Sequence, residues 1–169
     1  MSGVAVEIGS RQLAGLLEEL RRRVADPVPA LEEIGAGLEE LVRLGFHDSR
    51  DPWGGEWAGL RPVTLARRRK GRGAGAARPL RDSGNLMNSI TSRAQRDRVV
   101  VGTAVEYAPT HQYGARRGQY GRTRRGAPVP WGDVPARPFL PLREGHVELP
   151  DAWVREIAEV IRAHLEAGE

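Results

Sequence analysis

The side chains best suited to chemistry lie in one short stretch, YAPTHQYG, at residues 107–114. His111 stands there between two tyrosines, and Glu106 directly precedes the stretch. A histidine beside a carboxylate is a usual pair for general acid–base catalysis. Two interpretations are open: a hydrolytic site that uses His111 and Glu106, or a structural corner that follows the apolar run at 98–106.

The rest of the chain offers few partners for a catalytic histidine. The four histidines lack metal-ligand spacing, and the absence of cysteine excludes disulfides and thiol chemistry. Only 4 acidic side chains lie within 61–143, so a general base is scarce there. The sequence GRGAG at 71–75 lacks the Gly-Lys-Ser/Thr ending of a phosphate-binding loop. We therefore predict a protein that is not an enzyme and uses no cofactor or metal.

Charge is strongly segregated along the chain, although the net charge is only +4. Residues 1–60 carry 6 basic and 11 acidic side chains, residues 61–143 carry 18 and 4, and residues 144–169 carry 2 and 7. A chain with acidic ends and a basic middle is complementary to other copies of itself. The same pattern suits a nucleic-acid-binding protein, so charge alone leaves both kinds of partner open.

Two basic insertions, at about 67–79 and 115–130, hold most of the arginines. Such segments are solvated loops, contacts for acidic protein surfaces, or contacts for nucleic acid. Tyr113 and Tyr120 could stack on bases, but no nucleic-acid-binding motif accompanies them. The candidate basic interface residues are Arg67, Arg68, Arg69, Lys70, Arg72, Arg116, Arg117, Arg122, Arg124 and Arg125.

Hydrophobic periodicity predicts helices near both ends of the chain and a hairpin in the middle. Apolar residues recur at helical spacing over about 10–24, from Pro27 to about Gly45, and from 150 to about 167. Asp26 before Pro27 predicts a cap for the second helix. The segment 91–103 predicts a β-hairpin that turns at Arg96-Asp97.

A short strand is also predicted near the N-terminus, where Val4, Val6 and Ile8 alternate with small or charged residues. Short helices are expected within 61–70 and from a cap at Asp82 or Ser83 to Ile90. Between them, 71–79 reads as a flexible basic linker.

The remaining segments are predicted to be irregular. FHDSRDPWGGEWAGL at 46–60 combines glycines and a proline with Trp53 and Trp57, which indicates a loop anchored by buried indoles. The Arg/Gly-rich segment 115–133 has the composition of a loop or a disordered segment. VPARPFLPL at 134–142 is rich in proline and therefore extended, as an edge or docking segment.

Four motifs follow one another through the middle of the chain: FHDSRDPWGGEWAGLRPVT at 46–64, LRDSGNLMNSI at 80–90, VVVGTAVEYAPTHQYG at 99–114 and VPARPFLPL at 134–142. Together they resemble the virion morphogenesis, or tail-completion, proteins of Mu-like tailed phages. The matching positions are Asp51, Pro52, Gly54, Trp57, Leu60, Thr64, Ser83, Gly84, Leu86, Pro135, Ala136, Arg137, Pro138 and Phe139. The inserts at 71–77 and 115–130 are individual to this chain.

The resemblance implies an α+β fold, with a small antiparallel sheet packed against N- and C-terminal helices and long loops that become ordered on assembly. We expect one domain over 1–169. The implied function is structural: a homo-oligomeric ring, with a hexamer favoured, that completes the phage tail and joins it to the head. Its partners would be neck, connector or tail-tube proteins, with DNA possible in the lumen and no membrane. Its place would be the virion, after assembly in the bacterial host cytoplasm.

Within this interpretation three groups of residues have expected roles. The basic residues named above would contact neighbouring subunits or DNA. Pro135, Arg137, Pro138 and Phe139 would form a docking segment, and Trp53, Trp57, Tyr107, His111 and Tyr113 would be structural anchors. The alternative function is a small basic nucleic-acid-binding protein.

Overall fold

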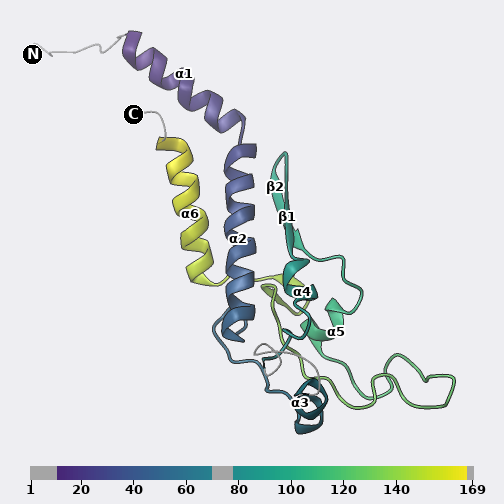
Figure 1. Cartoon of the computed structure of the whole chain (residues 1–169). Helices are drawn as coiled ribbons and strands as arrows, with labels where there is room; N and C mark the ends of the chain where they lie inside the picture. Colours follow the sequence, from purple (N-terminus) through teal and green to yellow (C-terminus); the bar gives the residue numbers. More distant parts are fainter. Residues whose placement is uncertain (1–10, 70–77, 167–169) are drawn as a thin grey trace, which may run out of the picture.

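The computed structural model describes residues 11–69 and 78–166 (Figure 1). Over these ranges the chain has an α+β fold, which confirms the predicted class. The long helix α2 (Val28–Asp48) packs against an antiparallel hairpin and against the closing helix α6 (Asp151–Glu166). The predicted strand at Val4–Ile8 and most of the predicted basic linker lie outside the described residues.

The N-terminal helices form as the periodicity predicts. Helix α1 (Arg11–Ala25) precedes α2, and the predicted cap at Asp26 is wrong by one residue, because the N-cap position is Pro27, which makes no side-chain capping hydrogen bond. The Asp26 Oδ1 accepts a hydrogen bond from the Val28 amide at 3.3 Å just before the helix. The predicted end near Gly45 is short by three residues, because α2 continues to Asp48 and ends at Ser49 in the left-handed region, φ 57°. The extra residues include Phe46, which is fully buried, so packing extends the helix past the glycine.

The predicted hairpin consists of β1 (Thr91–Gln95) and β2 (Arg98–Gly102), which are antiparallel and joined by the turn Arg96-Asp97. Its inward side chains lie directly on α2. A Cβ at Gly35 would stand 2.8 Å from the Ser92 Oγ and 3.1 Å from the Val99 Cγ2. The glycine therefore allows the sheet and the helix to approach this closely.

The shorter elements complete the fold. Helix α3 (Pro62–Arg69) forms within the predicted range. The helix predicted from a cap at Asp82 or Ser83 to Ile90 is shorter, since α4 is Asn85–Asn88 and its N-cap position is Gly84. The Ser83 Oγ accepts a hydrogen bond from the Asn85 amide at 3.3 Å. Helix α5 (Ala108–Tyr113) occupies most of YAPTHQYG. A second hairpin, β3 (Leu142–Arg143) with β4 (His146–Val147), was not predicted.

This second hairpin has a recognisable local cause. Its two turn residues, Glu144 and Gly145, both have positive φ, 51° and 84°. Positive φ at both central positions is the geometry of the turns that match the twist of a two-residue hairpin. None of the helices described here is long and apolar enough to cross a membrane.

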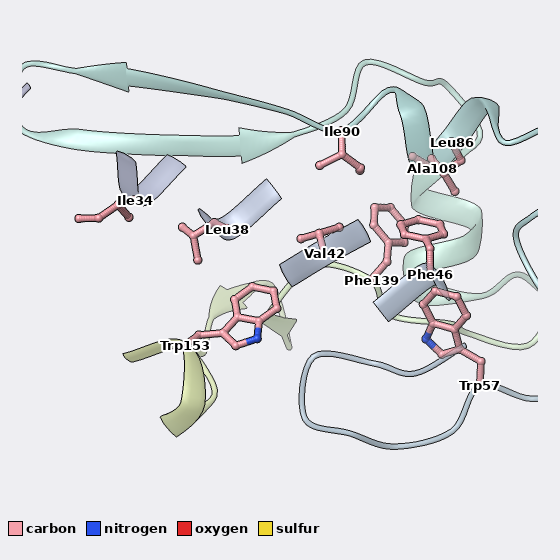
Figure 2. Packing of buried hydrophobic residues seen from close by; sticks show 10 residues of the cluster. All are labelled: Ile34, Leu38, Val42, Phe46, Trp57, Leu86, Ile90, Ala108, Phe139 and Trp153. Carbon is pink, nitrogen blue, oxygen red and sulfur yellow. The ribbon is translucent and has the colours of Figure 1, made fainter. Parts of the chain in front are cut away.

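The core lies along one face of α2, as Figure 2 shows. Ile34, Leu38, Val42 and Phe46 recur every four residues and point between the first hairpin and the segments that follow it. The other buried members are Trp57, Leu86, Ile90, Ala108, Phe139 and Trp153. The core therefore joins α2 to side chains from every later part of the fold.

The tryptophan-containing loop is anchored as its composition predicts. Asp51 organises the turn, since its Oδ1 accepts hydrogen bonds from the amides of Trp53 at 2.9 Å and Gly55 at 2.8 Å. Trp57 is buried and meets Phe46 edge to face, with ring centroids 5.3 Å apart. Its Nε1 donates a hydrogen bond to the Pro138 carbonyl oxygen at 2.8 Å.

Replacing Trp57 with alanine should strongly destabilise the fold. The change removes a buried indole from the aromatic contact and leaves the Pro138 carbonyl without its donor, so we expect a loss of roughly 3–5 kcal/mol in the free energy of unfolding. Urea denaturation followed by circular dichroism measures it. The matched control is Trp131→Ala, because Trp131 is 67 % exposed. Equal losses for the two variants would contradict the assigned role of Trp57.

Candidate functional site

Residues 115–134 form a long ribbon, called the arm below, that leaves the body after α5 and returns to it (Figure 1). At its base Ala115 and Val134 exchange two backbone hydrogen bonds of 2.9 and 2.8 Å. Further out, the Tyr120 amide donates to the Val129 carbonyl oxygen at 2.8 Å, and the Thr123 amide donates to the Ala127 carbonyl oxygen at 2.8 Å.

This ladder decides between the two interpretations that composition left open. The arm is a loop whose two sides are hydrogen-bonded to each other, and its order arises within one copy of the chain. The segment has few apolar side chains, which is why its composition also suited a disordered segment. Backbone hydrogen bonds do not require apolar side chains. Thr110 adds a side-chain tie between α5 and the arm, since its Oγ1 lies 2.8 Å from the Tyr120 hydroxyl.

The surface of the arm combines cations with aromatic rings. Tyr120 and Trp131 are both more than half exposed. The five predicted basic residues of this segment, Arg116, Arg117, Arg122, Arg124 and Arg125, are all exposed. Arg122 donates from Nη1 to the Gly126 carbonyl oxygen at 2.8 Å, so it also stiffens the tip. Asp133 is the acidic residue of the arm, and its Oδ1 accepts from the Arg117 amide at 2.8 Å.

The root of the arm requires Gly114. This residue has φ 77°, and a Cβ on it would stand 2.8 Å from the Val134 carbonyl oxygen and 2.9 Å from the Ala136 amide nitrogen. Both the backbone conformation and the close approach exclude a side chain. The glycine that ends YAPTHQYG thus lets the outgoing and returning strands of the arm meet.

Gln112 is the residue that the sequence analysis missed. It is only 4 % exposed, and its Oε1 accepts hydrogen bonds from the amides of Phe139 at 3.0 Å and Leu140 at 3.1 Å. Its Nε2 donates to the Leu140 carbonyl oxygen at 3.0 Å. Its spacing of four from buried Ala108 was the available signal, because both positions lie on one helix face.

The predicted docking segment is placed largely inside its own chain. Phe139 belongs to the core, with its ring centroid 5.4 Å from that of Phe46. Arg137 is buried and donates from Nε to the Ala58 carbonyl oxygen at 2.8 Å and from Nη2 to the Gly59 carbonyl oxygen at 3.0 Å. Pro138 supplies the carbonyl that Trp57 binds. Of the four residues, Pro135 is the exposed one, so a partner would meet this segment there.

His111 lies at the root of the arm and has a structural environment. Its ring meets that of Tyr107 edge to face at 5.7 Å, and its backbone carbonyl oxygen accepts from the Arg137 amide at 2.7 Å. Burial, and then the positive charges of Arg137 and Arg68, lower its pKa below the ordinary 6.5. The imidazole is therefore neutral at pH 7. Its Nδ1 is buried without a hydrogen-bond partner among the described residues.

Glu106, the predicted catalytic partner of His111, does not line the cavity at which His111 lies. That open cavity of 330 Å³ is lined by His111 together with Arg68, Asp82, Ser83, Tyr107 and others. Within residues 11–69 and 78–166, no group of three or more His, Asp or Glu side chains is arranged to hold a metal ion. Of the two interpretations of YAPTHQYG, the geometry favours the structural corner over the hydrolytic site.

The structure describes only part of the first basic segment. Lys70 and Arg72 lie outside the described residues, and the C-terminal half of α3 carries Arg67, Arg68 and Arg69. The Arg68 Nη1 donates to the Arg78 carbonyl oxygen at 2.9 Å, and its Nε lies 3.6 Å from the Asp82 Oδ1. Arg68 thus ties α3 to the chain that leads into α4.

The other predicted anchors differ in burial. Trp53 is half-buried beneath the Arg143 guanidinium, whose central carbon lies 4.0 Å from the ring centroid. Tyr107 is exposed at its edge, and its hydroxyl accepts from the Asn85 Nδ2 at 3.0 Å. Tyr113 is more than half exposed at the end of α5. The structure therefore brings Tyr107 and His111 together and leaves Tyr113 open to a partner.

Comparison with known proteins agrees with this structural character. A family model described as the phage virion morphogenesis family matches residues 8–166. The Mu-like prophage FluMu G protein 2 of Haemophilus influenzae is 34 % identical over 140 residues, which cover 82 % of this chain and 84 % of that protein. No solved structure gives a significant match.

Replacing Gln112 with alanine should loosen the root of the arm. The amides of Phe139 and Leu140 and the Leu140 carbonyl would lose their partners, so we expect roughly 2–4 kcal/mol less stability. Chemical denaturation measures the change. Gln119→Ala is the matched control, since Gln119 is exposed and accepts only the Arg116 amide at 2.9 Å. A loss no greater than that of the control would show that the buried amide does not hold this segment.

The lowered pKa of His111 predicts a dependence of stability on pH. Because the folded pKa lies below 6.5, the unfolded chain takes up the proton first as the pH falls. Stability is then lost from about pH 6.5 down to the folded pKa, below which this residue adds no further change.

The measurement is the free energy of unfolding of wild type and His111→Gln across pH 5 to 8. The variant should lose this part of the pH dependence, while His47→Gln, at an exposed position, should keep it. Parallel curves for wild type and His111→Gln would exclude a depressed pKa at this residue.

Proposed function

This chain belongs to the phage virion morphogenesis family, and on that premise we propose that it is a tail-completion subunit, at the head-proximal end of a phage tail, that helps to join the tail to the head. The family favours a structural and virion-associated protein over an enzyme. The proposed working form is a homo-oligomeric ring, with six copies favoured.

The observation that carries the proposal is the arm. Backbone pairing makes it a defined shape in one copy, and it extends away from the body (Figure 1). Its tyrosine, tryptophan and arginine side chains are exposed. Tyrosine, tryptophan and arginine are the residue types enriched where proteins bind one another. Order before contact also reduces the entropy lost on association. These are the properties of a preformed contact for a neighbouring subunit.

Charge supports a neighbour that is another copy of this chain. Outside the arm, α2 exposes Glu32, Glu33 and Glu40, and α6 exposes Asp151 and Glu156. Arginine forks bind such carboxylates well, in two parallel hydrogen bonds. A basic arm on one side of a subunit and acidic helices elsewhere form a heterologous pair of surfaces, and repeated use of such a pair closes into a ring.

Shortening the arm should prevent association without unfolding the subunit. The variant replaces residues 116–133 with Asn-Gly, which suits a tight two-residue turn and places the hydrogen-bonded pair Ala115 and Val134 directly beside that turn. We expect the intact chain to run as a multiple of 18.5 kDa, with six copies favoured, and the variant to run as a monomer with nearly unchanged melting temperature. Native mass spectrometry and light scattering measure the mass.

A second variant tests whether the positive charge of the arm, rather than its shape alone, drives association. Changing the five arm arginines to glutamine keeps the ribbon but removes its cations, so association should weaken and lose its salt dependence. A monomeric intact chain that binds duplex DNA, with affinity falling steeply as salt rises, would replace the ring with the nucleic-acid-binding alternative. A large loss of melting temperature on shortening the arm would show that the arm serves the subunit's own fold.

A further inference from the structure

The two outer edges of the first hairpin differ in whether side chains from the rest of the fold bind their backbone groups. On β1, the Ser92 amide donates to the Glu39 carboxylate, and the Arg43 Nη2 donates to the Ile90 carbonyl oxygen at 3.1 Å. The two α2 side chains also bind each other, with the Arg43 Nη2 2.7 Å from the Glu39 Oε2. This edge is closed by side chains, which is how sheet proteins block further pairing.

The edge of β2 is open. Because the turn is two residues long, Gln95 and Arg98 are a hydrogen-bonded pair, and so are Arg93 with Val100 and Thr91 with Gly102. The amides and carbonyls of Val99 and Val101 therefore point away from β1. Within the described part of the chain, nothing is hydrogen-bonded to them. An open edge of this kind is a template for one more strand.

An apolar groove lies beside this open edge. Its volume is 210 Å³, and every residue that lines it is apolar. It is lined by Val99 and Val101 of β2, by Leu38 of α2, and by Trp153 and Ile157 of α6. Val147 of the second hairpin also lines the groove and is 70 % exposed. A strand paired with β2 would place alternate side chains on this surface.

We propose that residues 3–9, GVAVEIG, of a second copy add to β2 as a third strand and fill this groove. Val4, Val6 and Ile8 alternate, so all three would face the groove from one side of the strand. Glu7 would then point to the outer face of the sheet, where Arg98 of β2 is exposed and binds the neighbouring Asp97. The apolar period of the segment is what matches the groove.

The placement of α1 favours a second copy over the same copy as the donor. The N-terminal end of α1 is the end remote from α2 and the first hairpin (Figure 1). In addition, Leu16, Leu17, Leu20 and Val24 form an apolar face of α1 that stays exposed in the single chain. A helix with an uncovered apolar face suits a connector that lies against the copy receiving the strand.

The inference rests on the proposed function in one respect, since it needs copies of the chain to associate. One groove and one N-terminal segment per copy would link each subunit to the next in a single direction, as a closed ring requires. The arm and the strand would then be separate contacts between neighbours.

Cysteine cross-linking tests the proposal without background, because the natural chain has no cysteine. The full-length variant Val6→Cys/Val147→Cys is treated with a short bismaleimide and separated under denaturing conditions. Position 6 is the middle of the alternating triplet, so it lies near the groove whichever way the strand runs. We expect a ladder of covalent multimers, with the link between residues 6 and 147 identified by peptide mass spectrometry.

Three variants control the experiment. Val6→Cys/Arg155→Cys should give few links between residues 6 and 155, since Arg155 is on the face of α6 away from Trp153 and Ile157. Adding Val4→Ser/Ile8→Ser to the test pair should lower the cross-linked fraction at least about tenfold, because two apolar contacts are lost. Adding the outward changes Ala5→Ser/Glu7→Gln should leave most of it.

The outcomes separate this inference from the proposed function. A monomer-mass product with an internal link would show that the segment occupies its own groove, and cross-linking no greater than with Arg155→Cys would show that it is elsewhere. Either result overturns the strand exchange, while the mass of the unmodified assembly reports independently on the ring. An unmodified chain that is monomeric at all concentrations overturns both.

Discussion

The contact of Phe46 with Trp57 and Phe139 holds together three segments that are far apart in the sequence. Phe46 ends the apolar face of α2, Trp57 ends the loop that follows it, and Phe139 comes from the segment after the arm. Each ring is buried, so separating any one of them from the others would expose apolar surface of all three. The position of the arm depends on this contact, because the chain returning from the arm enters the core at Phe139.

Buried polar groups give the same region its definite geometry. Arg137 binds two carbonyls of the tryptophan-containing loop. Gln112 binds the amides of Phe139 and Leu140 and the carbonyl of Leu140. Apolar contacts alone would tolerate sliding of an extended segment along the core. Hydrogen bonds of fixed direction do not, because a shifted segment would leave buried donors and acceptors unpaired. The root of the arm is thus held in one register, while the tip of the arm, with Arg122, Arg124 and Arg125, is exposed.

Several surfaces of the single chain remain exposed. The core lies along one face of α2, whereas α1, the β2 edge and the arm all present groups that the single chain leaves uncovered. In the proposed assembly, covering these surfaces would stabilise the folded subunit by mass action, and its stability would rise with concentration.

The sequence by itself determined the class of the fold, its helices and its first hairpin. These depend on local periodicity and turn chemistry: the apolar spacing of α2 and the two-residue turn at Arg96-Asp97 were both readable. Its motifs also indicated the family. The order of the arm was not readable, because backbone pairing leaves no trace in composition.

Only the tertiary structure decided which side chains make contacts within the chain and which remain exposed. Arg137 resembles the exposed arginines in sequence, yet it is buried against the tryptophan-containing loop. The spacing of Gln112 from Ala108 indicated a shared helix face, but the three hydrogen bonds of Gln112 follow only from the packed chain. The open edge of β2 likewise follows from where Glu39 and Arg43 reach. Each of these depends on residues brought together from distant positions, and such proximity is a property of the packed chain that no local pattern contains.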